Sequence, residues 1–277
     1  MPRLLVVGFG DIARRAAPLL APRFAISALS RSAGFDLDGR ITLALGAAEA
    51  LLHCAPPPPQ GERDLRTANL LTALDEQRVG PRRVVYISTS GVYGDCGGKR
   101  VAESWPLNPQ TARARRRADA EHQLSDWCAA RGAALVVLRA PGIYAAERLP
   151  IARLRARLAV LRREDDVYTS HIHADDLAIA AAHALEDDAP SGVYNAADDS
   201  ELLMADWLDL VAKHAGLPRP PRAPRAQIAE LVPTGLLTYM QESRRLDNAR
   251  LKQVLGVRLR YPTVHEGLRH EHAPGLH

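Results

Sequence analysis

Apolar residues along the first half of the chain alternate between two patterns. Short continuous apolar runs bounded by turn residues are typical of buried strands, whereas segments with apolar positions three or four residues apart are typical of helices. The strand pattern occurs at Arg3–Val7, Phe24–Ser30, Ala50–Cys54, Arg83–Ser88 and Ala134–Leu138, and the helix pattern at Asp11–Ala21, Arg63–Arg78 and Thr111–Arg131. Strands separated by helices predict an α/β fold in which helices cover both faces of a parallel sheet.

The second half of the chain is less regular. It predicts helices at Pro150–Arg163, Asp175–Glu186, Leu203–Ala215 and Arg245–Leu255, an extended piece at His171–His173 and a strand at Gly192–Ala196. Prolines without apolar periodicity indicate a loop over Leu217–Arg225. We expect a core over residues 1–145, followed by a mixed region, 146–277, that adds core elements at about 171–196 and ends in a small C-terminal lobe.

The most informative short motif is Gly8-Phe9-Gly10-Asp11-Ile12-Ala13, which follows the first strand and opens the first helix. A G-x-G-x-x-A turn in this position is the phosphate-binding fingerprint of the Rossmann fold. Gly8 permits the tight turn, Gly10 leaves room for a pyrophosphate, and Ala13 lets the helix pack closely on the strand. Backbone N–H groups at the start of the helix then face the phosphates. The motif therefore predicts a doubly wound Rossmann sheet that binds a dinucleotide, and a glycine turn without a ligand is the alternative.

The end of the second predicted strand bears on the choice of dinucleotide. An NAD site usually presents an acidic residue there to bond the ribose hydroxyls. This chain has Ser30 and Arg31 instead, and a hydroxyl beside a guanidinium suits a 2′-phosphate. We predict NADP, while Asp36 and Asp38 close by leave NAD possible. Beside the same cofactor we also expect the residues at the end of the third strand, Cys54, Ala55 and Pro56.

Several longer motifs occur downstream of the glycine turn. Val84–Gly94 reads VVYISTSGVYG, Leu138–Tyr144 reads LRAPGIY, and His173–Leu177 reads HADDL. With Val101–Glu103 and Val193–Asn195, these segments resemble the extended short-chain dehydrogenase/reductase superfamily, the NAD-dependent epimerase/dehydratase group, over nearly the whole chain.

The resemblance implies roles for individual residues. It implies a catalytic hydroxyl at Thr89, with Tyr93 as a further catalytic candidate and Tyr144 on the substrate side. It also implies contacts with the cofactor from Ser88, Thr89, Ala140 and Pro141.

The chain departs from the family pattern at the start of the long helix. The family carries Tyr-x-x-x-Lys there, in which the tyrosine exchanges a proton and the lysine holds the nicotinamide ribose. The matching positions of this chain are Arg113 and Arg117. Arg117 can still bind the ribose, but Arg113 stays protonated and cannot exchange a proton as a tyrosine does. We expect Arg113 on the substrate side, where an anionic small substrate is a further possibility.

Composition excludes several classes of protein. The formal net charge of +4 is small for 277 residues, and no basic patch with interleaved aromatic residues indicates a nucleic-acid surface. Three widely spaced cysteines predict neither a disulfide framework nor a metal site. We expect His270, His272 and His277 in a solvated tail. The resemblance of His173–Leu177 to the family motif accounts for His173 without a metal. Since no apolar run resembles a signal peptide or a membrane span, we expect a cytoplasmic protein, either a monomer or a homodimer, without a membrane partner.

Two hypotheses about function follow from these observations. The first is an NADP-dependent oxidoreductase or epimerase-like enzyme that acts on an unknown small substrate with an altered proton donor. The second is a catalytically inactive dinucleotide-binding sensor or scaffold, which the replacement at Arg113 and Arg117 favours. A substitute proton donor could be Tyr93, Tyr144, His171 or His173, and the sequence alone favours a structural role for each.

Overall fold

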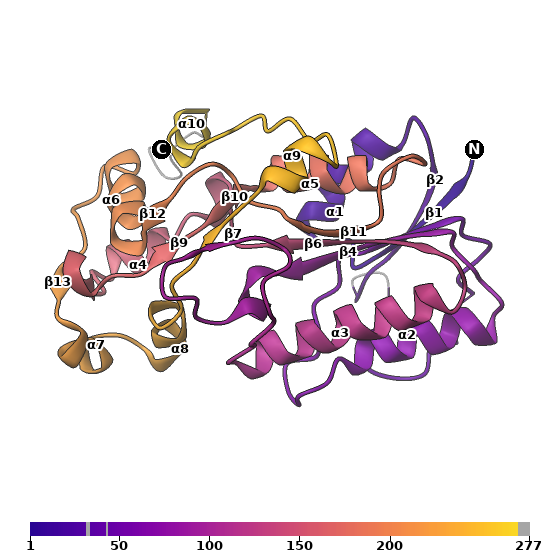
Figure 1. Cartoon of the computed structure of the whole chain (residues 1–277), viewed down its shortest axis with the longest axis horizontal. Coiled ribbons are helices and arrows are strands. Elements are labelled where there is room, and N and C mark those ends of the chain that lie inside the picture. The colour runs from indigo at the N-terminus through magenta and orange to yellow at the C-terminus, as the bar shows by residue number, and fades with distance from the viewer. Residues whose placement is uncertain (32–33, 43, 271–277) are drawn as a thin grey trace.

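Six parallel strands form the central sheet, in the order β11-β6-β4-β3-β1-β2 (Figure 1). The computed structural model describes residues 1–31, 34–42 and 44–270. The strands are β1 Arg3–Val7, β2 Ala25–Leu29, β3 Ala50–His53, β4 Arg83–Thr89, β6 Ala134–Ala140 and β11 Gly192–Asn195. All six match predicted segments within one or two residues, so the predicted Rossmann-like parallel α/β sheet is confirmed.

Helices cover both faces of this sheet, as the alternating pattern predicts (Figure 1). Helices α1 Asp11–Leu20 and α5 Ala174–Ala184 pack on one face, where Ile12, Ala16 and Leu177 are buried. Helices α2 Leu65–Glu76 and α3 Ala112–Ala129 pack on the other face. Each face of the sheet contacts its own apolar cluster, so the sheet is buried on both sides. This burial explains why the sequence of each strand is a continuous apolar run.

An irregular segment takes the place of a helix between β2 and β3. Within its described residues, 34–42 and 44–49, the chain forms no helix, yet several apolar side chains are buried against the α2 face. These side chains are Phe35, Leu37, Ile41, Leu45 and Ala48. The β2–β1–β3 order makes the carboxyl ends of β1 and β3 a switch point, where open α/β sheets bind ligands.

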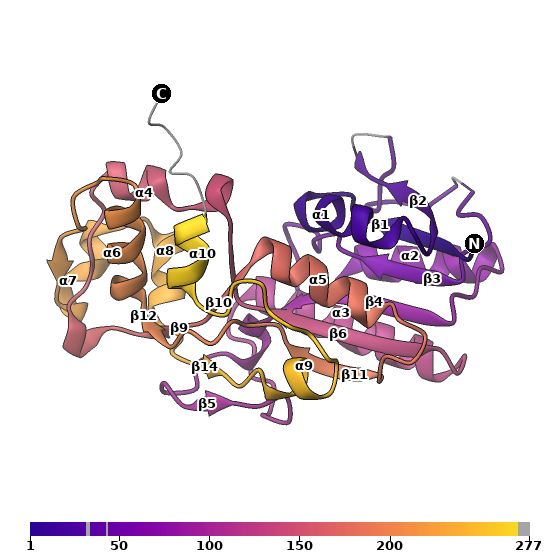
Figure 2. The same cartoon turned by 90° about the horizontal axis from the view of Figure 1, so that it is seen from above.

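The C-terminal lobe lies beyond the carboxyl ends of the strands (Figure 2). It contains α4 Ile151–Arg155, β8 Val160–Leu161, β9 Tyr168–Thr169, β12 Leu202–Leu203, α6 Met204–His214, β13 Arg222–Ala223, α7 Arg225–Leu231, α8 Thr234–Leu237 and α10 Val264–His270, with the 3-10 turns η3 Ala146–Arg148, η4 Arg163–Asp165 and η5 Thr238–Met240. Its apolar residues form a third cluster, which includes Leu154, Trp207 and Leu268. Two short pairs connect elements near the lobe: β10 His171–His173 with β7 Gly142–Tyr144, and β12 with β9.

Two predicted helices are wrong in part. The helix expected over Pro150–Arg163 ends at Arg155, and the chain then enters β8, which pairs with β13. The helix expected over Arg245–Leu255 starts with β14, Arg245–Leu246, which pairs with β5, Arg100–Val101, and only α9 Ala249–Gln253 is helical. Pairing between distant segments overrides the local helical spacing in both cases.

The last part of the chain returns from the lobe to the sheet. After β14, residues Leu251, Leu255 and Val257 join the apolar cluster on the α5 face. The Asp176 carboxylate of α5 then accepts hydrogen bonds from the backbone N–H groups of Arg260 and Tyr261. Helices α7, α8 and α10 were not predicted, and His270, expected in a tail, ends α10, while His272 and His277 lie outside the described residues. Among the described residues, no helix has the length and apolar character needed to cross a bilayer.

Candidate functional site

The glycine turn sits at the carboxyl end of β1 and has a shape that only glycine provides. Gly8 has a φ of +87°, and a Cβ placed on it would lie 2.5 Å from the backbone nitrogen of Ala55. Gly10 forms the N-cap of α1, and the space where its Cβ would point is open. The first N–H groups of a helix have no partner within the helix, so this opening is suited to an anion.

A cavity of about 270 Å³ opens at this turn. Its lining comes from the ends of three strands, from the irregular segment after β2 and from the start of α2. The lining residues are Gly8, Phe9, Gly10, Leu29, Ser30, Arg31, Phe35, Asp36, Leu37, Cys54, Ala55, Pro56 and Arg66. Eight of the residues predicted for the cofactor therefore lie together, and they are Gly8, Phe9, Gly10, Ser30, Arg31, Cys54, Ala55 and Pro56. Asp11 lies at the start of α1, and the side chain of Ile12 is buried in the core.

The two acidic residues that left NAD possible differ in their surroundings. Arg66 donates two hydrogen bonds of 2.6 Å to the Asp38 carboxylate, and these bonds hold the pKa of Asp38 below its ordinary value. The same guanidinium also donates to the backbone oxygens of Pro56 and Pro57. Asp36 lines the cavity, whereas Asp38 does not.

Polar residues behind the cavity were not singled out from the sequence. The Nε2 atom of His53 lies 3.0 Å from the Thr67 hydroxyl, which in turn donates to the Asp64 carboxylate. Burial, with the nearby charge of Arg117, lowers the pKa of His53 to about 3, so its imidazole is neutral. Burial also raises the pKa of the Cys54 thiol to about 12, so Cys54 is not a nucleophile at neutral pH.

A second cavity, of about 360 Å³, lies between the carboxyl ends of β4 and β6 and the C-terminal lobe. We call this cavity the substrate-side cleft. Its lining residues are Thr89, Ser90, Arg113, Pro141, Gly142, Ile143, Arg148, Tyr168, Thr169, Ser170, Met204, Tyr239, Glu242 and Arg244. Thr89, Pro141 and Arg113 are the predicted residues that it brings together. Tyr168, Tyr239, Glu242 and Arg244 were missed, because no local motif marks them.

The two catalytic candidates lie in different surroundings. Thr89 lines the cleft, and its hydroxyl accepts a hydrogen bond from the backbone N–H of Gly91. Tyr93 is fully buried and does not line either cavity. The Tyr93 hydroxyl accepts from Arg139 and donates to Asn195, and burial raises its pKa to about 12. The geometry therefore favours Thr89 over Tyr93 as a group that meets a substrate.

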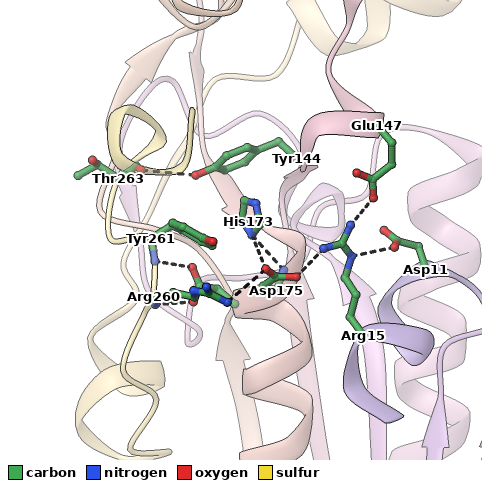
Figure 3. Close-up of polar contacts among 10 residues, drawn as sticks. Asp11, Arg15, Tyr144, Glu147, His173, Asp175, Arg260, Tyr261 and Thr263 are labelled. Atoms are coloured by element: carbon green, nitrogen blue, oxygen red, sulfur yellow. Dashed lines mark hydrogen bonds and ion pairs between the residues drawn. The ribbon is translucent and has the colours of Figure 1, made fainter. Parts of the chain in front are cut away.

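Other predicted residues lie around the cleft without lining it. Arg117 donates from Nη1 to the Tyr86 hydroxyl and to the Ile87 carbonyl, at 2.9 Å each. Ser88 donates to the Glu121 carboxylate, and Ala140 is buried beside Pro141. Tyr144 is buried in the lobe, where its hydroxyl donates to the Thr263 carbonyl at 3.5 Å (Figure 3).

A charged network joins the glycine turn to the lobe (Figure 3). Arg15 of α1 donates to three carboxylates, which belong to Asp11 of α1, Glu147 of η3 and Asp175 of α5. Arg148, which lines the cleft, also donates to Asp11 at 2.8 Å. Partial burial alone would raise the pKa of Asp11, but the bonds from Arg15 and Arg148 outweigh it and lower that pKa.

The two motif histidines do not form part of a metal site. His173 caps α5, since its Nδ1 accepts from the Asp175 N–H, and His171 is buried against Tyr144 and Trp207. Across residues 1–31, 34–42 and 44–270, no group of three or more His, Cys, Asp or Glu side chains is placed to hold a metal ion.

A parallel sheet with a glycine turn at its switch point, beside a cleft under a C-terminal lobe, defines the class of Rossmann-like α/β proteins. The model of the NAD dependent epimerase/dehydratase family matches residues 65–197. The matched segment includes both the Thr89 strand and the start of α3.

Known proteins resemble this chain to different degrees. A functionally unknown conserved protein from Silicibacter pomeroyi is 30% identical, with a TM-score of 0.80 and 97% of each chain covered. MoeE5 in complex with UDP-glucose and NAD has a TM-score of 0.72, with 96% of each chain covered. RMD from Pseudomonas aeruginosa complexed with NADPH has a TM-score of 0.73, with 97% of each chain covered. The last two are each 21% identical to this chain and show the shared fold.

A curated relative matches only part of the chain. This protein, the 3-diazoavenalumate denitrifying reductase of a Streptomyces species, is 31% identical over 103 residues. The match covers 37% of this chain and 34% of the relative.

Proposed function

We propose that the protein is an NADP(H)-dependent oxidoreductase or epimerase-type enzyme that acts on a small molecule in the substrate-side cleft. The observation that carries the proposal is the pairing of two cavities at one edge of the sheet, with the glycine turn in the first and Thr89 in the second. The open space over Gly10 fits a pyrophosphate, because a side chain there would fill it. The match of residues 65–197 to the epimerase/dehydratase family, and the partial match to a reductase, support this proposal.

The residues of this chain would bind and orient the two reactants. A nicotinamide dinucleotide, when bound, supplies or accepts a hydride. The start of α1 would hold its phosphates. Arg117 would hold the nicotinamide ribose, by its match to the family's lysine position. Thr89 would donate a hydrogen bond to the reacting oxygen of the substrate, since its own oxygen already accepts from Gly91.

The preference for NADP rests on Ser30 and Arg31 at the mouth of the first cavity. Replacing Arg31 by Asp should lower NADPH affinity about thirtyfold relative to NADH affinity, because a favourable ion pair becomes a repulsive one. Isothermal titration calorimetry with both cofactors measures the ratio. Arg219→Asp, on an exposed side chain of the lobe, is the charge-matched control. An unchanged ratio in Arg31→Asp would show that Arg31 does not bind the 2′-phosphate.

A hydride-transfer assay tests whether the protein is an enzyme. Purified protein should move deuterium from NADPH labelled at C4 into a carbonyl or nucleotide-sugar substrate, and Thr89→Val should reduce the rate about a hundredfold. The NADPH affinity of Thr89→Val should remain close to that of the wild type, since the adenosine half of the cofactor would bind in the other cavity. Tight NADPH binding without transfer to any tested substrate would contradict the proposal.

That contrary outcome would support the second candidate, a dinucleotide-binding sensor or scaffold without catalysis. The observation that favours it is Arg113 in the cleft, at the position where the family has its proton-exchanging tyrosine. A guanidinium does not release its proton at ordinary pH, so an active enzyme must take its proton from another group.

A further inference from the structure

The substrate-side cleft has more positively charged than negatively charged side chains in its lining. Four charged side chains line it: Arg113, Arg148, Arg244 and Glu242. Arg244 donates to the Glu242 carboxylate at 2.7 Å, and Arg148 donates to Asp11 at 2.8 Å. Arg113 forms no ion pair with any residue in the described part of the chain. One positive charge in the cleft is therefore left without a carboxylate.

Arg113 is nevertheless held in a defined place. It is the second residue of α3, and its Nη1 donates to the Tyr239 hydroxyl at 2.6 Å. Its guanidinium also lies over the Tyr239 ring, 5.0 Å from the centroid. Tyr239 belongs to η5 of the lobe, so this contact spans the cleft from the sheet side to the lobe. The other N–H groups of the guanidinium have no hydrogen-bond partner among the residues that the structure describes.

Two hydroxyl groups in the cleft are available as donors beside Arg113. The Tyr239 oxygen accepts from Arg113, so its own proton is free for a ligand. The Thr89 oxygen accepts from the Gly91 N–H, and its proton is free in the same way. Three elements, β4, α3 and η5, thus bring N–H and O–H donors to one cleft.

We propose that Arg113 and Tyr239 bind an oxyanion group of the substrate, a carboxylate or a phosphate ester, while Thr89 donates to the reacting oxygen in the same cleft. A guanidinium offers two parallel N–H donors that match either group, and the unbalanced charge favours an anion over a neutral ligand. The inference rests on the proposed function in taking this cleft as the substrate site. It gives Arg113 a binding role in place of the proton transfer that its position has in the family.

Matched ligands test the site without requiring turnover. Calorimetry with the NADP-loaded protein should show that benzoate binds about tenfold more tightly than benzamide, which has the same shape without the charge. Phenyl phosphate serves as the second anionic probe. A preference for benzoate would identify a carboxylate as the natural group, and a preference for phenyl phosphate would identify a phosphate ester; each supports the site.

Substitutions then assign the binding to Arg113. Arg113→Gln should abolish the preference for the anion, and Tyr239→Phe should weaken it several-fold by removing one donor. The matched control is Arg115→Gln, which removes a charge from the same turn of α3 but from a side chain that pairs with Glu62 outside the cleft. Arg115→Gln should leave both affinities within about twofold of the wild type.

The possible failures are distinguishable. Equal binding of benzoate and benzamide, no binding of either anion, or an unchanged preference in Arg113→Gln would each overturn the oxyanion site. An intact preference in a protein that transfers no hydride would keep the site and reject the proposed enzyme. Hydride transfer by a protein that does not prefer anions would keep the enzyme and reject the site.

Discussion

Gly8 and Gly10 stand two residues apart in one turn, but a methyl group would meet different surroundings at each. At Gly8 it would clash with the backbone of Ala55, and the positive φ would be strained as well. At Gly10 it would enter open space. The fold itself therefore requires the first glycine, whereas nothing within 4 Å in the fold requires the second.

Alanine at each position separates these two roles. Gly8→Ala should lower the free energy of unfolding by about 2 kcal/mol or more, from backbone strain and the clash together. Gly10→Ala should leave the melting temperature of the free protein unchanged and weaken NADPH binding about tenfold or more, because the methyl group occupies the place of the pyrophosphate. Thermal unfolding with and without NADPH measures both effects. Normal NADPH affinity in Gly10→Ala would place the phosphates elsewhere.

Local sequence located some of these residues and missed others for a physical reason. Ser30 and Arg31 follow β2, and Thr89 ends β4. Since the carboxyl ends of parallel strands meet at one edge of a sheet, their position was predictable. Tyr239 lies 126 residues from Arg113, in a lobe whose fold no periodic pattern reveals. A residue such as Tyr239, which joins the cleft only through tertiary contact, has no recognisable motif in the sequence around it.

At the scale of elements, Arg15 connects three segments that carry the site. Its guanidinium forms ion pairs with carboxylates of α1, η3 and α5 (Figure 3). Helix α1 follows the glycine turn, η3 contains the cleft residue Arg148, and α5 packs on the sheet. Without Arg15, three acidic side chains would face one another with only the neighbouring arginines Arg148 and Arg260 to offset them. The network therefore fixes how the lobe sits against α1.

Arg15→Gln should lower the free energy of unfolding by about 1 kcal/mol at neutral pH. The folded-state pKa of Asp11 lies below its ordinary value of 3.8, so its ion pairs stabilise the fold above that pH and are lost as the pH falls further. The difference between Arg15→Gln and the wild type should accordingly shrink below about pH 4 in urea unfolding. Arg14→Gln, on the exposed side of the same helix, is the control. A difference that persists in acid would point to lost packing and not to charge.

The strength of each segment's own pattern decided which elements were predictable. The six strands of the sheet and helices α1, α2, α3, α5 and α6 have apolar patterns of their own, and all were found. Segment 156–163 has leucines at helical spacing, but Arg157 adopts a positive φ of 52° and the chain turns into β8. Short strands such as β8 and β14 exist only because a distant partner pairs with them.

Across the whole molecule, two buried histidines make stability depend on pH. Burial lowers the pKa of both His53 and His171 to about 3, from an ordinary value of 6.5. Each is neutral in the folded state and binds a proton more readily when unfolded. The stability that they contribute is thus complete above pH 6.5 and is lost progressively as the pH falls towards 3.

The histidines should therefore lower the free energy of unfolding between pH 6.5 and pH 5. Asp198, whose pKa is raised well above its ordinary value by burial, contributes with the opposite sign. His171→Leu should reduce this slope by about 1 kcal/mol per pH unit, whatever its effect on stability at neutral pH. Urea unfolding at several pH values measures the slope. His122→Leu, on an exposed histidine, should leave the slope unchanged. An equal slope in His171→Leu and the wild type would show that His171 does not resist protonation.

The return of the chain from the lobe to the sheet also has a consequence for biosynthesis. Leu251, Leu255 and Val257 complete the apolar cluster on the α5 face, although the last strand of the sheet ends at Asn195. While a ribosome is still making the lobe, that cluster lacks part of its cover, and its apolar side chains face water or a chaperone. The core of the nascent sheet can therefore close only after residues 251–257 have been made.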